Sequence, residues 1–231
     1  MNANDRSLKI DLRDQPAYSV AEAARYLKLP VATLRSWVVG RPYPKGDGVG
    51  QSRPLIHPPK KRPPLLTFWN LIEAHVLRAL RTEHGVAIKH VREALKYAEK
   101  QENIDRLLLH KDLRTNAGKL FLEKYGELIE LSASGQMAMR RVFEDHLERV
   151  EWDDWQFPVR LYPFVSGEFE KRPIAIDPNI SFGRPILVRA GVSTGVIADR
   201  IDAGESVDVL ADDYGLTAHE IEQAVLYERA A

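Results

Sequence analysis

The sequence contains no cysteine and no long apolar run. Without cysteine the chain forms no disulfides and no thiolate metal sites, which fits a reducing compartment. No stretch reaches the roughly 18 consecutive apolar residues of a membrane-spanning helix. Met1 to Arg6 are polar, and no apolar signal-like run follows them. These absences predict a cytoplasmic protein with no membrane partner.

The sequence also lacks a recognisable catalytic set. It has no phosphate-cradling glycine-rich loop, and its seven histidines are scattered without metal-ligand spacing. The run from Glu151 to Trp155 contains three acids and two tryptophans, and its carboxylates offer a possible divalent-ion site. We interpret it as an acidic helix end with aromatics packed below. The sequence therefore predicts no enzyme, no catalytic residue, no metal site and no cofactor. A hydrolase acting through this acidic run remains an alternative.

Charge divides the chain into two unlike halves. The formal net charge is zero, yet residues 1–100 carry 18 Lys and Arg against 9 Asp and Glu. Residues 101–231 carry 15 Lys and Arg against 24 Asp and Glu. A basic half can bind phosphate with release of counterions, whereas an acidic half suits a protein partner. This asymmetry predicts two separate tasks.

Helical patterns occupy most of the basic half. After a flexible N-terminus at 1–16, Ser19 and Glu22 form a capping-box pattern that starts one helix. Leu29-Pro30 separates it from a second helix over 31–38. Residues 40–64 are rich in glycine, proline and basic side chains, which indicates a wing. Two more helices are expected over 68–83, capped by Thr67, and over 88–100. This order predicts a winged helix-turn-helix over 17–100.

The second helix of such a domain enters the major groove of DNA. Basic and hydroxyl side chains in that helix and in the wing are therefore the expected DNA contacts, since they bind base edges and phosphates. They are Thr33, Arg35, Ser36, Arg41 and Arg53.

Two segments carry a resemblance to a known family. Residues 18–27, Tyr-Ser-Val-Ala-Glu-Ala-Ala-Arg-Tyr-Leu, are followed by Thr33-Leu34-Arg35 and the aromatic Trp37. This pattern resembles the MerR family of winged-helix regulators over about 17–100. The wing is longer and richer in proline than is usual there. The family's dimerising coiled coil and effector-binding cysteines are absent, so the resemblance does not imply a metal sensor.

The region 101–173 has a mixed pattern. Leu107–His110 is a short apolar run that indicates a strand, and residues 119–131 have the pattern of a β-hairpin. A helix is expected over 137–150, and strands over 159–165 and 174–176. This region is expected to connect the two ends of the chain, and the sequence leaves open whether it folds by itself.

The C-terminal region predicts three short helices over 194–203, 206–214 and 217–228. Its turns contain Asp177-Pro178, Gly183-Arg184-Pro185 and Gly204-Glu205-Ser206, and Thr217 with Glu220 forms a second capping-box pattern. These residues resemble a small domain of formerly unknown function that is common in bacterial antitoxins. The resemblance covers 174–229, and we expect the domain to span 174–231. The predicted fold is thus α+β, mainly α. It has an N-terminal winged helix-turn-helix, a small central β-hairpin or strand region, and a C-terminal three-helix domain.

Together the two resemblances look like a VapB-type antitoxin. They imply a PIN-domain ribonuclease toxin of the VapC kind as partner, and repression of the protein's own operon by operator binding. Binding as a homodimer, or as a higher toxin–antitoxin assembly, is expected because one helix-turn-helix reads only a half-site. Arginines facing a carboxylate-rich toxin site are the candidate inhibitory residues, namely Arg184, Arg189, Arg200 and Arg229. The alternative is a one-component MerR-like regulator that senses a small molecule through residues 101–231.

Overall fold

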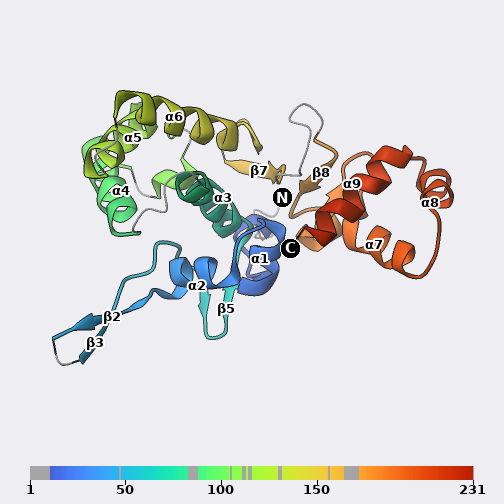
Figure 1. The fold of residues 1–231 in the computed structure, drawn as a ribbon, viewed down its shortest axis with the longest axis horizontal. Coiled ribbons are helices and arrows are strands. Elements are labelled where there is room, and N and C mark those ends of the chain that lie inside the picture. Colours follow the sequence, from blue (N-terminus) through green and yellow to red (C-terminus); the bar gives the residue numbers. More distant parts are fainter. Residues whose placement is uncertain are drawn as a thin grey trace, which may run out of the picture.

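The computed structural model describes residues 11–46, 48–82, 88–104, 106–110, 113, 116–129, 132–155, 157–163 and 172–230. Buried side chains form two hydrophobic cores. The larger extends in sequence from Tyr18 to Ile176, and the smaller from Ile174 to Tyr227. Figure 1 shows the larger part on the left and the C-terminal helices on the right. The region 101–173 thus contributes to the same core as the N-terminal region.

The helix-turn-helix consists of α1 (Val20–Tyr26) and α2 (Val31–Val39). The Ser19 hydroxyl accepts the backbone N–H of Glu22 at 3.2 Å, and the Glu22 carboxylate accepts that of Ser19 at 2.9 Å. The predicted capping box is therefore confirmed. Lys28 has a φ of 52° in the tight turn, and Pro30 is the N-cap of α2. The prediction of two short helices around Leu29-Pro30 is confirmed.

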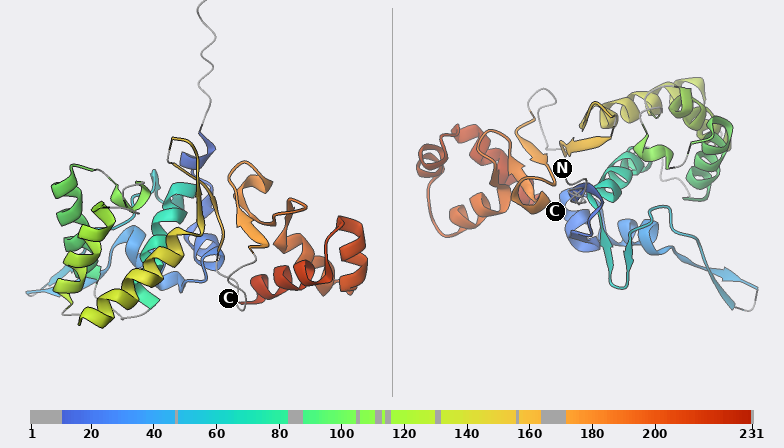
Figure 2. Two further views of the ribbon diagram at one scale, coloured as in Figure 1. Left: turned by 90° about the horizontal axis from the view of Figure 1, so that it is seen from above. Right: turned by 180° about the vertical axis from the view of Figure 1, so that it is seen from behind.

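Two hairpins follow α2. The first pairs β2 (Pro42–Lys45) with β3 (Gly48–Gln51). The second pairs β4 (Lys60–Lys61) with β5 (Pro64–Leu66), and β1 (Tyr18–Ser19) completes a three-stranded sheet in the order β1-β5-β4. Both hairpins project from the side of the molecule on which α2 lies (Figures 1 and 2). The predicted wing is therefore two hairpins.

Four longer helices follow the hairpins. They are α3 (Phe68–Thr82), α4 (Ile88–Glu102), α5 (Asn116–Leu128) and α6 (Ala133–Leu147), with a short 3₁₀ helix η2 (Leu107–Leu109) between α4 and α5. The Thr67 hydroxyl caps α3 by accepting the backbone N–H of Asn70 at 3.2 Å, as predicted. The predicted strand over 107–110 is wrong, because all three leucines of η2 are buried by a single helical turn.

The predicted hairpin over 119–131 is also wrong, because α5 occupies most of that segment. Phe121, Leu122 and Tyr125 are buried at helical spacing, and they bring one face of α5 into the larger core. Gly126, interpreted as a turn residue, lies inside the helix. A Cβ at Gly126 would lie 3.0 Å from the Gln136 side chain on α6. The glycine therefore permits a close approach of two helices.

The central strands lie further along the chain. Strands β6 (Val150–Trp152), β7 (Pro158–Leu161), β8 (Ile174–Ile176), β9 (Pro185–Leu187) and β10 (Val192–Ser193) form an antiparallel sheet in the order β10-β9-β8-β7-β6. The acidic run beginning at Glu151 thus starts in strand β6 and not at a helix end. The sheet joins the two parts of the molecule, because β8 contributes Ile176 to the larger core and Ile174 to the smaller one.

The C-terminal domain contains the three predicted helices, α7 (Thr194–Asp202), α8 (Val207–Tyr214) and α9 (Ala218–Arg229), after a short 3₁₀ turn η4 (Ser181–Gly183). Ser206 caps α8, and Thr217 with Glu220 forms the predicted capping box of α9. Gly215 ends α8 with a φ of 62°, a conformation that glycine adopts without strain. The predicted fold class, α+β and mainly α, is confirmed.

Part of the N-terminal segment is ordered, contrary to the prediction of flexibility over 1–16. Residues Leu12–Asp14 form a 3₁₀ helix, η1, whereas residues 1–10 lie outside the described residues. Arg13 bonds Asp11 at 2.8 Å and Asp153 at 2.7 Å, and its guanidinium lies 5.8 Å from the Trp69 ring centroid. These contacts attach the segment to the larger part. No helix among the described residues is both long and apolar enough to span a membrane.

Candidate nucleic-acid interface

Helix α2 buries one face and exposes the other. Leu34 and Trp37 are buried in the larger core, whereas Ala32 and Arg35 are exposed and Ser36 is half-buried. Thr33, predicted to contact DNA, is only 6% exposed. The part of α2 that can meet a groove is therefore the strip that contains Ala32, Arg35 and Ser36.

A hollow of about 550 Å³ runs along this strip. It brings together four of the five predicted DNA-contact residues, Thr33, Arg35, Ser36 and Arg41. Arg53, the fifth, lies outside the hollow, on the loop that follows β3.

The base of the β2–β3 hairpin is fastened against α2. Ser52 donates its N–H to the Arg41 carbonyl and accepts the Arg41 N–H on its hydroxyl, both at 2.8 Å. Gln51 donates its side-chain amide to the Val39 carbonyl at 3.0 Å. Gly40 has a φ of 88°, and a Cβ there would lie 2.0 Å from the Ser52 carbonyl oxygen. Only glycine allows this close approach, which sets the position of the hairpin beside α2.

Basic side chains occupy the two hairpins and the loops around them. Residues 25–62 contain nine Lys and Arg and a single acid, Asp47. Arg41 and Lys45 are exposed on the first hairpin, and Lys60, Lys61 and Arg62 are exposed at the end of the second. The pKa of His57 is lowered by burial and by the nearby cations Arg106, Lys61 and Arg92. Such a dense positive surface attracts a polyanion.

The sequence-based prediction missed a group of cations on α4. Lys89, Arg92 and Lys96 are separated by three and four residues, so they lie on one helical face, beside Arg53. This spacing was visible in the sequence, but only the fold places that face beside the hairpin.

The four C-terminal arginines predicted to face a toxin have different surroundings. Arg200 pairs with Glu205 and, at 2.6 Å, with Asp213, while Arg229 pairs with Asp202 at 2.7 Å. Arg189 donates to the Gly215 carbonyl and lies 3.8 Å from Glu220. Arg184 is exposed and forms no salt bridge with another described residue. Arg184 therefore differs from the other three arginines, each of which lies 3.8 Å or less from a carboxylate.

Apolar side chains are exposed in the same domain. Phe182 is 92% exposed and has a φ of 56° in the η4 turn, which Arg184 follows directly. A non-glycine residue in this conformation is uncommon, and exposing a large aromatic ring favours contact with a partner. Further exposed apolar residues of the domain are Val188, Val196, Val209 and Leu226.

Helix α9 of the C-terminal domain packs directly on α1 of the helix-turn-helix. The buried Tyr227 donates its hydroxyl to the Tyr26 carbonyl at 2.7 Å, and Lys28 lies 3.9 Å above the Tyr227 ring. Arg25 pairs with Glu228 at 3.1 Å. The two terminal domains are therefore in contact through a buried tyrosine and an ion pair, although about two hundred residues separate them in sequence.

No group of three or more His, Asp or Glu residues that could hold a metal ion occurs within the described ranges. In the acidic run, Asp153 instead bonds Arg13 and accepts the backbone N–H of Phe157 at 2.8 Å. The carboxylate of Glu151 pairs with Arg160 at 3.2 Å and accepts the Tyr162 hydroxyl at 2.9 Å. These acids are thus held by their own neighbours.

Comparison with known families gives a match at each end of the chain. Residues 16–95 match a family described as "Putative DNA-binding HTH domain". Residues 174–227 match a family described as "Protein of unknown function (DUF433)". The predicted N-terminal helix-turn-helix is therefore confirmed by both the family match and the geometry.

Two proteins of Mycobacterium tuberculosis are similar over nearly the whole chain. "Putative antitoxin VapB45" is 29% identical, over 96% of this chain and 98% of its own length. "Uncharacterized protein Rv2308" is 26% identical, over 94% of this chain and 91% of its own length. The predicted resemblance to a VapB-type antitoxin is confirmed.

A solved structure shares the fold. The crystal structure of Rv2018 from Mycobacterium tuberculosis has a TM-score of 0.66 and 24% sequence identity, covering 92% of this chain and 98% of that chain. The likeness shows that the whole arrangement, from the helix-turn-helix to the C-terminal helices, recurs in an experimental structure.

Proposed function

We propose that this protein is a DNA-binding antitoxin that represses its own operon and neutralises a PIN-domain ribonuclease toxin. The observation that carries the DNA part is the exposed strip of α2 beside two basic hairpins. The similarity to a protein named as an antitoxin supports the toxin part. The protein acts by binding and carries out no catalysis.

In DNA binding, α2 enters the major groove and Arg35 contacts a base edge, because Arg35 is the basic side chain on the exposed strip of α2. Arg41 and the basic ends of the hairpins contact phosphates on either side of the groove. Thr33 is only 6% exposed, so it offers little surface for direct readout. A homodimer places two α2 helices on the two half-sites of a palindrome.

In toxin binding, the C-terminal domain provides the partner surface. Residues 177–231 contain ten Asp and Glu against four Arg, so this domain is repelled by DNA and remains available to a protein. Phe182 fills a pocket on the toxin, and Arg184 pairs with the carboxylates that hold the toxin's metal ion. Arg184 is favoured over Arg189, Arg200 and Arg229 because it need not break an ion pair first.

Co-expression with the product of the neighbouring small gene tests both parts of the proposal. We expect a stoichiometric complex in which the partner's ribonuclease activity is lost. Fluorescence anisotropy then measures binding of the complex to DNA from upstream of the operon, and the affinity should fall steeply as salt rises. A partner that stays active, or never associates, contradicts the antitoxin role. Failure to bind any upstream DNA contradicts the repressor role.

A one-component regulator with a small-molecule effector is the second candidate function. It is favoured by a hollow of about 640 Å³ whose lining includes Glu73, Arg106 and Leu108. Burial raises the pKa of Glu73, even though the carboxylate bonds Arg106 and Asn70. A genome neighbourhood without a PIN-like gene, together with a metabolite that raises the melting temperature and alters DNA affinity, would favour this function over the first.

A further inference from the structure

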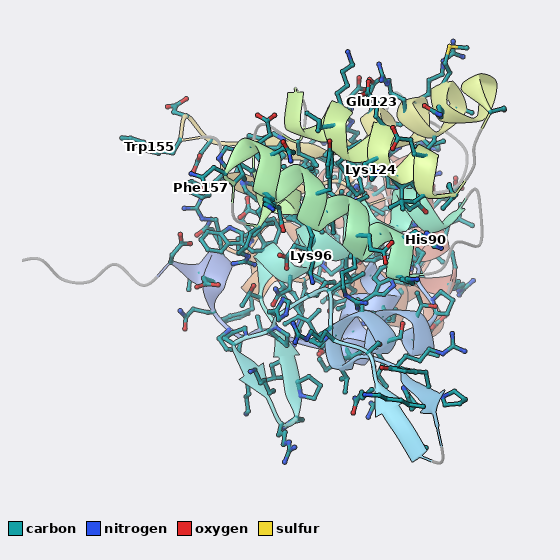
Figure 3. The ribbon with its side chains drawn as sticks, turned by 90° about the vertical axis from the view of Figure 1, so that its left-hand side faces the viewer. His90, Lys96, Glu123, Lys124, Trp155 and Phe157 are labelled. Atoms are coloured by element: carbon teal, nitrogen blue, oxygen red, sulfur yellow. The ribbon has the colours of Figure 1, made fainter. Side chains whose placement is uncertain are left out.

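A cationic cleft of about 530 Å³ lies between the base of the β2–β3 hairpin and helix α4. Its lining residues contain four cations and no acid, and they are Tyr43, Gln51, Ser52, Arg53, Lys89, Arg92 and Lys96. In Figure 3, Lys96 lies on the side of α4 that faces the hairpins, whereas Glu123 and Lys124 lie above α4 on α5. We call this hollow the α4 cleft.

Arg92 joins the two walls of the α4 cleft. One of its terminal nitrogens donates to the carbonyl oxygen of Arg53. Its Nε is buried and has no hydrogen-bond partner among the described residues. A buried donor without an acceptor is costly, and the Arg92 guanidinium, which lines the cleft, is a charged donor that suits a phosphate oxygen.

Among the described residues, few ion pairs hold the other cations of the cleft, although Glu73 and Glu99 line the adjoining hollow that shares Arg53, Arg92 and Lys96 with it. Lys96 forms no ion pair with a described residue. Lys89 lies 3.8 Å from Glu93, but both side chains are largely exposed, so this pair contributes little. Burial and the neighbouring Arg53 both lower the pKa of Arg92. Cations held together in this way repel one another until an anion binds.

The α4 cleft continues the surface of α2. Arg41 lines the hollow along α2, and its backbone bonds Ser52, which lines the α4 cleft. The same hairpin base therefore has the recognition helix on one side and the cations of α4 on the other. A DNA backbone leaving the groove beside Arg41 meets this second group of cations next.

We propose that the α4 cleft is a phosphate-binding site, occupied by the backbone of DNA that flanks the segment read by α2. This inference rests on the proposed DNA-binding function and extends the footprint beyond the helix-turn-helix and its hairpins. Arg53 and Arg92 donate to the phosphate oxygens, and Lys89 and Lys96 neutralise the charge. The chemistry would also suit a free phosphate compound, so the test separates the two sources.

The first arm of the test measures DNA affinity against salt for the double variant Lys89→Gln/Lys96→Gln. Lys119→Gln on α5 is the matched control, since Lys119 is an exposed helical lysine away from the cleft. Each phosphate contact contributes about 0.9 to the slope of log K against log salt, so the double variant should lose about 1.8. The loss should appear on upstream DNA with flanks and vanish on a duplex trimmed to the site itself.

The second arm needs no DNA. Inorganic pyrophosphate is titrated into the ¹⁵N-labelled chain, and the backbone amide signals of Ser52 and Arg53 are followed. We expect saturable shifts in the wild type and in Lys119→Gln, and none in the double variant. Thermal melting checks that all variants fold alike, because neither lysine lies in a core.

The two arms distinguish every failure. If pyrophosphate binds but the salt slopes of wild type and double variant agree, the cleft binds phosphate but not the DNA backbone. The proposal that flanking DNA occupies the cleft is then overturned. If neither arm distinguishes the double variant from the wild type, the phosphate site is overturned. If the wild type binds no DNA at all, the repressor role fails, and the pyrophosphate titration alone decides whether the cleft binds phosphate.

Discussion

The hydroxyl of Tyr227 donates a hydrogen bond to the backbone carbonyl of Tyr26, 2.7 Å away, and so joins the last helix to the first. Tyr227 is 1% exposed, and its burial raises its pKa well above the ordinary value. The carbonyl of Tyr26 lies at the end of α1, where helix carbonyls need external donors. A side chain from the opposite end of the chain therefore supplies the hydrogen-bond donor that the last carbonyl of α1 needs.

Tyr227→Phe should destabilise the protein by about 1–2 kcal/mol, because it removes the donor and leaves the Tyr26 carbonyl unsatisfied. Urea unfolding followed by circular dichroism measures the change. Tyr97→Phe is the control, since Tyr97 is 40% exposed, and it should have almost no effect. Equal stability of wild type and Tyr227→Phe would mean that water replaces the hydroxyl and that the contact adds little.

Arg35→Ala should weaken binding to upstream DNA by about 1–3 kcal/mol and relax sequence preference at one position of each half-site. Arg140→Ala is the control, because Arg140 is also exposed but belongs to α6, which lies away from α2 (Figure 1). Anisotropy titrations on a panel of single-base variants provide the measurement. Unchanged affinity and preference would remove Arg35 from the base-reading role.

Arg41→Ala should weaken DNA binding to about the same extent for every sequence. A phosphate contact carries no base information, so the preference among sites stays constant while the salt slope falls by about 0.9. Comparison with Arg35→Ala on the same DNA panel tests the division of roles. A change of sequence preference in Arg41→Ala would show that the hairpin base reads bases.

Arg184→Ala should weaken inhibition of the partner ribonuclease by about 2–5 kcal/mol, if Arg184 pairs with its carboxylates. Arg200→Ala is the comparison: Arg200 already pairs with Glu205 and Asp213 within the domain, so its removal should leave inhibition intact. Ribonuclease assays at increasing antitoxin concentration measure both. Loss of inhibition only in Arg200→Ala would transfer the role to the paired arginine.

Acid should destabilise the protein through His75 and His146, whose rings lie 5.1 Å apart in the larger core. Burial lowers the pKa of His146 to about 4, and burial lowers that of His75 well below 6.5. Below pH 6.5 the unfolded chain therefore binds more protons than the folded one, and stability falls as the pH falls towards 4. His146 alone should cost about 2 kcal/mol between pH 7.5 and 5.

Urea unfolding at a series of pH values measures this loss. His146→Gln removes one of the two titrating groups and should flatten the profile between pH 6.5 and 5, whatever its effect at neutral pH. A wild-type profile that is flat in this range would show that both histidines titrate in the folded state as they do in the unfolded chain.

Local signals in the sequence predicted the ends of the molecule well. Ser19 with Glu22 and Thr217 with Glu220 are capping boxes, which depend on residues three positions apart. The short turns around Pro30 and Gly215 likewise depend on nearby residues. For these reasons the helix-turn-helix and the three C-terminal helices were predictable without knowledge of the fold.

The structure of the middle of the chain was harder to predict, because it depends on contacts between residues far apart in sequence. Tyr125-Gly126 has the local pattern of a turn, and only the close approach of α6 at Gln136 explains a glycine inside a helix. Thr33 has the position of a DNA contact in the helix, but packing buries it. The cations of α4 form one site with Arg53 only because the β2–β3 hairpin lies beside them in the fold.

The strand β8 has a consequence for how such chains evolve. The match to the C-terminal family begins at residue 174, and Ile176 of that first strand pairs with Leu161 and belongs to the larger core. A recombination event at this boundary would remove strand β8, and with it Ile176, from the larger core. A C-terminal segment exchanged into this chain therefore keeps the larger core intact only if it supplies a matching strand, and with it a matching surface for α1.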